Sequence, residues 1–206
     1  MISTDEKTGM QALEHLYEAK PVRPGLIERI EFEYIRHGTL ALIANFDVVT
    51  GKVISPSIGP TRTEEDFVAH VRKTIDNDPF AAWIFVTDQL DTHRSAKLVE
   101  LIAQQCGLEE PLGIKGKEGI LKSKATRKEF LADETHRIRF VYTPRHCSWL
   151  NQVEIWFSIL ARRLLKRASF VSTEDLKSRV LQFIAYFNSV LAKPFRWTYT
   201  GRPLQA

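Results

Sequence analysis

The first half of the chain alternates apolar runs of strand length with a helical pattern. Thr39–Val49 is almost purely apolar, which predicts a strand buried on both faces, and Lys52–Ser55 after a polar turn predicts the returning strand of a hairpin. Thr63–Asp78 begins with acidic residues and repeats apolar residues at helical spacing, so we expect a helix there. Ala81–Val86 is an uninterrupted apolar run and indicates a buried parallel strand.

The second half predicts helices and one more strand. Arg94–Gln105 has the pattern of a helix, and Arg137–Tyr142 that of a strand with one exposed face. Ser148–Arg167 and Thr173–Leu191 predict two closing helices. Gly107–Asp133 is rich in Gly and Lys, so we expect an inserted loop or small flap outside the core. This order predicts an α/β fold: a mixed sheet flanked by helices, with a basic insert (about 107–133) before the last core strand.

The composition suits one globular domain. The chain has 206 residues, of which 44% are hydrophobic and 26% charged, and we expect a single domain over 1–206 with a C-terminal helical part at 148–206. The longest stretch without a charged residue, Val180–Ala192, has 13 residues, whereas a membrane span needs about 20. The N-terminus has no apolar signal stretch. We therefore expect a cytoplasmic protein without membrane contact.

The net charge of +4 is mild but unevenly distributed. Gly113–Arg139 contains eight Lys and Arg against four Asp and Glu, and Ala161–Arg179 contains six against two. Such basic runs suit a surface that binds a polyanion, while a solvated helix face is the common alternative. Charge by itself leaves both interpretations open.

Two aspartates lie where strands are expected to end. Asp88 follows the apolar run that ends at Val86, so it lies at the carboxyl edge of the sheet, where ligands of open α/β sheets bind. Capping of the following helix is the alternative for this residue. Asp5 belongs to a short β-leaning start that breaks at Gly9, and its residues alone suit a surface terminus. The two aspartates can form a site only if the fold brings them together.

Glu154 lies on the predicted helix over 148–167. At about 100° per residue, an apolar arc faces the core; it consists of Trp149, Leu150, Val153, Trp156, Phe157, Leu160 and Leu164. Glu154 falls just outside this arc, at the seam between core and solvent. An exposed helix glutamate without a role could lie anywhere on the polar side.

Several blocks of the sequence carry a resemblance to a known family. They are Thr4–Gly9 with Gln11–Leu13, Tyr34–Thr39, Asp88 with Thr92-His93, Tyr142–Glu154 and Lys193–Thr198. In these blocks, which extend over nearly the whole chain, the sequence resembles bacterial insertion-sequence transposases related to the mariner group, which are DDE superfamily endonucleases. The Ser148–Glu154 part is highly specific. The resemblance implies a ribonuclease-H-like catalytic domain whose DDE triad is matched by Asp5, Asp88 and Glu154.

The resemblance also implies a metal-dependent activity on DNA. The three acids would hold two Mg²⁺ or Mn²⁺ ions, with Asp5 bridging both, Asp88 holding one and Glu154 the other. Two such ions can activate a water or a 3′-hydroxyl and stabilise the leaving oxygen, and hard cations prefer carboxylate ligands. The implied function is DNA transposition, by phosphodiester cleavage and strand transfer at transposon ends. The implied partners are double-stranded transposon ends and target DNA, near the bacterial nucleoid, and a homo-oligomer is left open.

Further residues are candidates around the triad. His93 would orient a carboxylate or a phosphate, or be a satisfied histidine at a helix start, and Asn151 would hydrogen-bond near the metal site. Trp149 is expected to anchor its helix in the core. Basic residues are candidates for phosphate contacts; they are Lys122, Lys124, Arg127, Lys128, Arg162, Arg163, Lys166 and Arg167.

The sequence departs from the family pattern in three ways. It has no N-terminal helix-turn-helix region, which such transposases use to recognise their element ends. Only four residues precede Asp5, so we expect a truncated first strand in an N-terminally truncated chain. Asp88 and Glu154 are separated by 65 residues, more than is usual in the family, and the excess lies in the insert. The alternative function is therefore a catalytically impaired transposase that only binds DNA or the full-length enzyme.

Overall fold

The computed structural model describes residues 1–29, 31–145 and 147–196. Its strands are β1 (Ile2–His15), β2 (Tyr34–Asp47), β3 (Val53–Gly59), β4 (Trp83–Thr87) and β5 (Ile138–Tyr142). Its α-helices are α1 (Glu64–Ile75), α2 (Ala96–Cys106), α3 (Lys124–Leu131), α4 (Gln152–Leu160) and α5 (Thr173–Tyr186). Two signature residues, Trp197 and Thr198, lie outside the described residues, as do His146 and the end of the expected 148–206 helical part.

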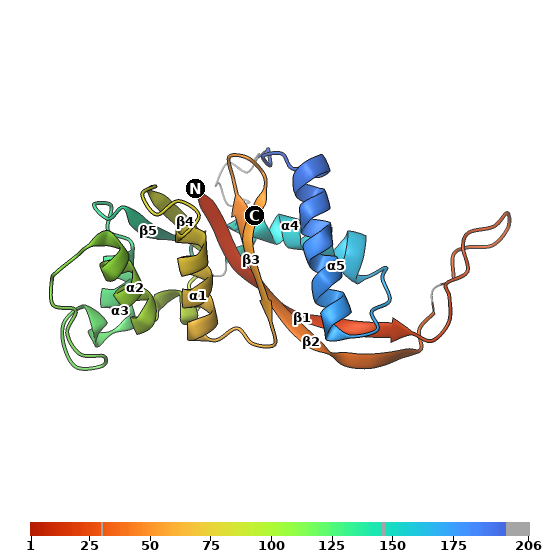
Figure 1. Cartoon of the computed structure of the whole chain (residues 1–206), viewed down its shortest axis with the longest axis horizontal. Helices are drawn as coiled ribbons and strands as arrows, with labels where there is room; N and C mark the ends of the chain where they lie inside the picture. Colours follow the sequence, from red (N-terminus) through yellow and green to blue (C-terminus); the bar gives the residue numbers. More distant parts are fainter. Residues whose placement is uncertain (30, 146, 197–206) are drawn as a thin grey trace, which may run out of the picture.

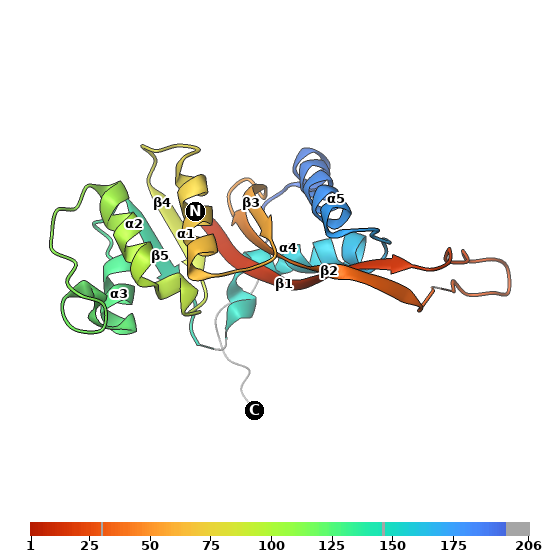
Figure 2. The ribbon, with the colours of Figure 1, turned by 60° about the horizontal axis from the view of Figure 1, so that its bottom comes forward.

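The strands form one mixed sheet with the order β3-β2-β1-β4-β5. β1 pairs with β2 in antiparallel and with β4 in parallel orientation, so it is the central strand where the sheet changes direction. Figures 1 and 2 show α1, α2 and α3 gathered beside β4 and β5, and α4 and α5 beside β1 and β2. The prediction of a mixed sheet flanked by helices is confirmed.

Two hydrophobic clusters cover the two faces of the sheet. One contains Phe67 of α1, Phe85 of β4 and Leu98 of α2, together with Ile2 of β1. The other contains Phe46 of β2 with residues of α4 and α5, among them Trp156, Phe157 and Leu176. A helix layer on each face is how a sheet that is apolar on both sides buries its surface.

β1 is a long strand in which a bulge reverses the alternation of its side chains between the two faces of the sheet. Between Lys7 and Met10 it carries one residue more than β2, and Gly9 adopts a φ of 68° in the left-handed region. Odd-numbered Ser3 therefore faces the same side as even-numbered Met10, which belongs to the α4 cluster. The expected break at Gly9 is wrong, because the glycine makes a bulge and pairing continues to His15.

The connection between β1 and β2 forms an arm, residues 16–33. Its described residues continue the hairpin with bridges such as Lys20 to Arg29, and Figures 1 and 2 show it extending away from the rest of the molecule. Ile27 and Phe32 on the arm are 83% and 81% exposed. The arm is therefore an extension of β1 and β2 and contributes little to either hydrophobic cluster.

The basic insert is part of the core in its second half. α3 begins after Ser123, whose hydroxyl accepts a hydrogen bond from the amide of Thr126 at 3.1 Å. Leu121, Phe130 and Leu131 are buried in the same cluster as α2. The expectation of a loop or flap outside the core is wrong here, because the few apolar residues of the insert gather on one side of a capped helix.

The other helices begin close to their predicted positions. α1 has a capping box, in which the Thr63 hydroxyl accepts from the Asp66 amide and the Asp66 carboxylate accepts from the Thr63 amide. α2 begins after Ser95 and ends at Gly107, which has a left-handed φ of 66°. Among the described residues no helix is long and apolar enough to cross a membrane.

A buried histidine on α1 makes the stability of this fold sensitive to acid. His70 is 1% exposed, and its Nδ1 lies 2.9 Å from the Ser57 hydroxyl of β3. Burial, with a contribution from Lys73, lowers the pKa of His70 to about 3. The unfolded chain, with a histidine pKa of about 6.5, therefore binds one proton more than the folded chain between these two values, and stability falls as the pH falls through this range.

We expect His70→Gln to reduce this acid sensitivity. From pH 6 to pH 4.5 the slope of the unfolding free energy against pH should decrease by about 1.4 kcal/mol per pH unit, the value for one proton. Urea unfolding of both proteins across this range measures the slope. Parallel curves for wild type and variant would contradict the assignment to His70.

Candidate active site

Strand register brings two of the predicted acids together. Ser3 of β1 is paired in parallel with Val86 of β4, so Asp5 and Asp88, each two residues further on, lie at the same level of the sheet. Oxygens of the two carboxylates and a ring nitrogen of His93 lie within 4.8 Å of one another. Asp5 is 6% exposed, and Asp88 follows the end of β4 with a partly exposed side chain.

Glu154 is held in the first turn of α4 by polar contacts between this helix and β1. The Asn151 side chain donates to the Thr4 carbonyl at 2.8 Å and to Asp5 Oδ2 at 3.3 Å, and accepts from the Ser3 hydroxyl. Asn151 occupies the N-cap position but makes no capping bond of its own. The Ser3 hydroxyl instead accepts from the Val153 amide at 2.8 Å, so the strand that carries Asp5 caps the helix that carries Glu154.

His93 connects Asp88 to a fourth carboxylate, Glu6. Its Nδ1 lies 2.8 Å from Asp88 Oδ1, and its Nε2 lies 3.1 Å from Glu6 Oε2. The side chains of His93 and Glu6 are 0% and 2% exposed. Glu6 follows Asp5 on β1 and therefore points to the opposite face of the sheet. Both ring nitrogens of His93 are thus occupied by carboxylates.

The acids of this site differ in their tendency to ionise. Burial, with repulsion from Asp88 and Glu6, raises the pKa of Asp5 to about 7. Burial opposes ionisation of Asp88 too, but hydrogen bonds from His93 and the Leu90 amide outweigh it and lower the pKa of Asp88. Burial also raises the pKa of Glu154, and the negative charge of Asp88 adds to this effect.

His93 carries a proton in this arrangement. Burial would lower its pKa, but the hydrogen bonds with Asp88 and Glu6 outweigh burial and raise the pKa of His93 to about 10. A protonated ring has no lone pair to offer a metal ion. The contact with Asp88 Oδ1 keeps His93 a candidate for orienting that carboxylate, and its ring nitrogen also lies close to the Asp5 and Asp88 oxygens.

The donor set suits a hard divalent cation. Asp5, Asp88 and Glu154 offer carboxylate oxygens, which Mg²⁺ and Mn²⁺ prefer. Burial is the main cause of the raised pKa of Asp5, and the negative charges of Asp88 and Glu6 add to it. A divalent ion would supply positive charge and keep Asp5 ionised.

The other predicted residues differ in their burial and in their contacts. Trp149 is 50% exposed, so the expectation that it anchors α4 in the core is wrong; a short 3₁₀ turn before Asn151 takes it out of the helical arc. Arg127 is 8% exposed and faces the core side of α3, which does not fit a phosphate contact. Lys124 pairs with Asp91 at 2.5 Å, and Lys128 lies 5.3 Å over the Tyr142 ring.

The remaining basic candidates are exposed on the surface. Lys122 lies on the insert, and Arg162, Arg163, Lys166 and Arg167 lie at the carboxyl end of α4 and just beyond it. Within the described part of the chain, none of these five residues makes an ion pair. Their charges are therefore available to an anionic partner.

Sequence reasoning missed three residues beside the triad. Glu6 could have been noticed because it is the next residue after Asp5 on an expected strand. Arg94 and Arg145 line a cavity of about 450 Å³ next to Asp88. Arg145 lies three residues after the end of β5, and Asp88 directly after the end of β4, so both are in the chain segments that leave the carboxyl edge of the sheet.

This sheet order, with acids at neighbouring strands and on the following helix, is that of a ribonuclease-H-like nuclease fold. The family model described as DDE superfamily endonuclease matches residues 1–177. The chain belongs to this family. A search of curated proteins found no match.

Two solved structures are similar in fold. The crystal structure of the Mos1 mariner paired end complex with Mn has a TM-score of 0.54 and 15% sequence identity. The Mos1 transposase paired-end complex with left transposon end has a TM-score of 0.52 and 14% identity. In both comparisons the match covers 89% of this chain and 47% of the other. The chain therefore spans about half the length of these transposase chains.

We expect substitutions of Asn151 to loosen the contact between α4 and β1. Asn151→Ala removes the side-chain donor to the Thr4 carbonyl and to Asp5 Oδ2 and should lower the unfolding free energy by about 1–3 kcal/mol. Asn151→Asp keeps the shape but places another carboxylate against Asp5, so it should cost more at pH 7. Urea unfolding in EDTA measures both variants. An Asn151→Asp protein as stable as wild type would contradict this account.

Proposed function

We propose that the chain is the catalytic domain of a transposase that cuts and joins DNA with divalent metal ions held by Asp5, Asp88 and Glu154. The observation that carries this proposal is the parallel register of β1 and β4, which sets Asp5 beside Asp88. The docking of α4 on β1 through Asn151 supports the placement of Glu154. Family membership and the fold support the reaction class.

The residues present fit the metal ions that such a reaction uses. Asp5 would bridge two ions, Asp88 would hold one, and Glu154 the other, with Mg²⁺ or Mn²⁺ as the ion. When bound, the ions activate a water or a 3′-hydroxyl for attack on phosphorus and stabilise the leaving oxygen.

The chain's own residues prepare this site. The backbone amide of Glu6 donates to Asp5 Oδ1 at 2.8 Å, and the side-chain amide of Asn151 donates to Oδ2 at 3.3 Å. The carboxylate therefore cannot rotate freely. His93 and the Leu90 amide both contact Asp88 Oδ1, at 2.8 and 2.9 Å. This arrangement leaves Oδ2 of Asp88 for a ligand and fixes its direction.

The cavity beside Asp88 supplies positive charge for a DNA phosphate. Arg94 and Arg145 line it, and Arg94 is held by hydrogen bonds to the Gln89 carbonyl at 2.6 Å and to Asp91 at 3.1 Å. Arginine suits phosphate because its planar group donates two parallel hydrogen bonds. We propose that these two residues position the strand that is cut.

We also propose which DNA the chain acts on, where it acts and in what assembly. The DNA would comprise transposon ends and target DNA. Lys122 and the exposed arginine and lysine side chains just after α4 would contact its phosphates. The reaction would take place in the cytoplasm near the nucleoid, and it would involve a homo-oligomer so that two ends are processed together.

Cleavage assays test the catalytic role of the acids. With labelled element-end DNA and Mg²⁺ or Mn²⁺, Asp88→Asn or Glu154→Gln should reduce cleavage more than about 100-fold, because even outer partners of metal ligands contribute about 10–100-fold. Asp76→Asn, at an exposed acid on the far end of α1, is the matched control. Equal background cleavage by wild type and variants would instead support a chain that only binds DNA.

Unfolding measurements test metal binding without catalysis. At about 100 times its dissociation constant, Mn²⁺ should raise the unfolding free energy of the wild type by about 2.7 kcal/mol. Asp5→Asn should lose this gain because it removes the bridging carboxylate, whereas Asp76→Asn should keep it. A gain of the same size in Asp5→Asn would place the ion elsewhere.

A further inference from the structure

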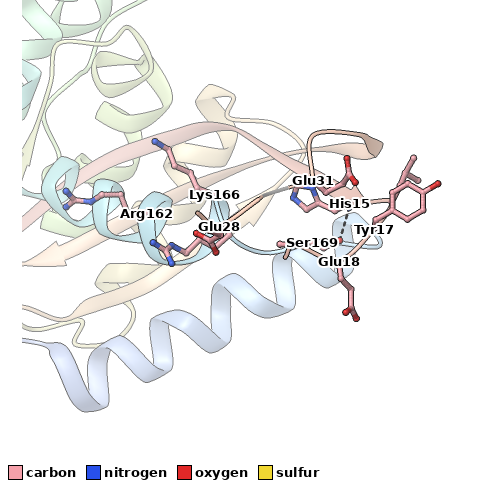
Figure 3. Close-up of a pocket in the computed structure, with 11 residues that line it drawn as sticks. His15, Tyr17, Glu18, Glu28, Glu31, Arg162, Lys166 and Ser169 are labelled. Carbon is pink, nitrogen blue, oxygen red and sulfur yellow. Dashed lines mark hydrogen bonds between the residues drawn. The ribbon is translucent and has the colours of Figure 1, made fainter. Parts of the chain in front are cut away.

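Two cavities meet at the carboxyl end of α4, and their charges differ. The first, of about 900 Å³, lies between this end of the helix and the base of the arm. Figure 3 shows Arg162 and Lys166 on its helix side and Glu18, Glu28 and Glu31 on its arm side. Arg167 lines this cavity as well, so its three glutamates are matched by three cations, of which Arg162 and Arg167 also line the second cavity.

The second cavity, of about 820 Å³, has cations and no acid in its lining. Its cations are Arg162, Arg163, Arg167 and Lys193, and all four are exposed. None of them makes an ion pair with any residue that the structure describes. Four unpaired positive charges around one cavity repel each other, so an anion bound there would be favourable.

Aromatic side chains form the rest of this cavity. Tyr186 is 50% exposed at its rim, and Phe183 is half-buried beside it. Phe187 is 2% exposed, and Phe195 is stacked on Phe46 with ring centroids 4.6 Å apart. The buried Phe187 and the stacked, partly buried Phe195 fix this part of the lining, while Tyr186 remains open to solvent.

Both helices leave regular α-helical geometry where they line this cavity. Arg162 and Arg163 belong to the π-helical segment Ala161–Leu165, and Phe187 and Leu191 to the π-helical segment Phe187–Leu191. Such segments are rare and occur often at functional sites. Their presence in both walls of one cavity is an independent indication that the cavity binds a ligand.

We propose that this cavity binds an unpaired nucleotide of a DNA strand, with the cations on its phosphates and Tyr186 stacked on its base. Stacking requires an open base face, which a duplex covers with neighbouring base pairs. The inference rests on the proposed function for its choice of DNA. Arg162 follows Glu154 by eight residues, or about 12 Å of helix, which is about three to four nucleotides at about 3.4 Å each.

Binding of matched oligonucleotides to the full chain tests this site. A labelled single strand and a duplex of the same sequence are titrated in EDTA, where no cleavage can occur, and affinity is read by fluorescence anisotropy. Tyr186→Ala should weaken single-strand binding about tenfold, a typical loss for one stacked base, and leave duplex binding unchanged. Tyr186→Phe, which keeps the ring, should bind both like wild type. Phe80→Ala removes a ring that is 93% exposed elsewhere and should change neither.

A second readout reports stacking directly. A 2-aminopurine base in the single strand should lose fluorescence on binding to wild type, and less so on binding to Tyr186→Ala. Unchanged single-strand affinity in Tyr186→Ala, as expected for a surface that docks a protein, would overturn the proposal. So would an equal loss for both DNA forms, or a wild type that does not bind single strands.

The outcome is independent of the catalytic proposal. Cleavage and the Tyr186 effect report on different places, because Tyr186 lines this cavity and Asp88 lines another. A chain without metal-dependent cleavage but with the Tyr186 effect would refute the proposed function and retain this site. A cleaving chain without the Tyr186 effect would do the reverse.

Discussion

The short parallel pairing of β1 with β4 is the constraint on which the rest of the site depends. Only Ile2 and Ser3 of β1 are paired with β4 in the described structure, yet these two pairs set the level of Asp5 against Asp88. Ser3 also caps α4 and contacts Asn151, so the same residue fixes the height of the helix that carries Glu154. Three acids from distant parts of the sequence thus take their positions from one end of one strand.

The electrostatics of the site follow from its place in the middle of the sheet. Successive residues of β1 point to opposite faces, so Asp5 and Glu6 bring negative charge to both sides of the same strand. His93 contacts Glu6 and Asp88, while burial and the charges of Asp88 and Glu6 outweigh its effect on Asp5 and raise the pKa of Asp5 to about 7. Because this pKa is raised on folding, Asp5 by itself contributes stability that the metal-free chain loses as the pH rises from about 4 to about 7, opposite in sign to the contribution of His70. A bound divalent ion would reverse that dependence.

The sequence predicted the elements whose signals are local. Apolar runs and helical spacing located β2, β4 and the main helices, as the acidic first turn of α1 illustrates. The first strand and the insert were misread for physical reasons. Gly9 is a common strand breaker but here takes the left-handed conformation of a bulge, and α3 has few apolar residues, which α2 and β5 cover only after the chain has folded.

The candidate site was predictable where a side chain follows a strand end, as for Asp88, or where a motif is specific, as for Glu154. The contacts of Asn151 with Thr4 and Asp5 join residues almost 150 positions apart in the sequence, and no local pattern contains that pairing. The same is true of the ion pair between Glu6 on β1 and His93 in the segment after β4. Long-range polar contacts are what the structure adds to the sequence.

The bulge at Gly9 has a consequence for how insertions and deletions would act on this chain. Before the bulge, odd-numbered residues face α4, and after it, even-numbered residues do. Deletion of one residue at the bulge would make the pairing of β1 with β2 regular, so Asp5 would keep its register and Met10 and Ala12 would still face the apolar cluster. The bulge is thus a point at which β1 can lose one residue while the acidic site and the apolar contacts both keep their faces.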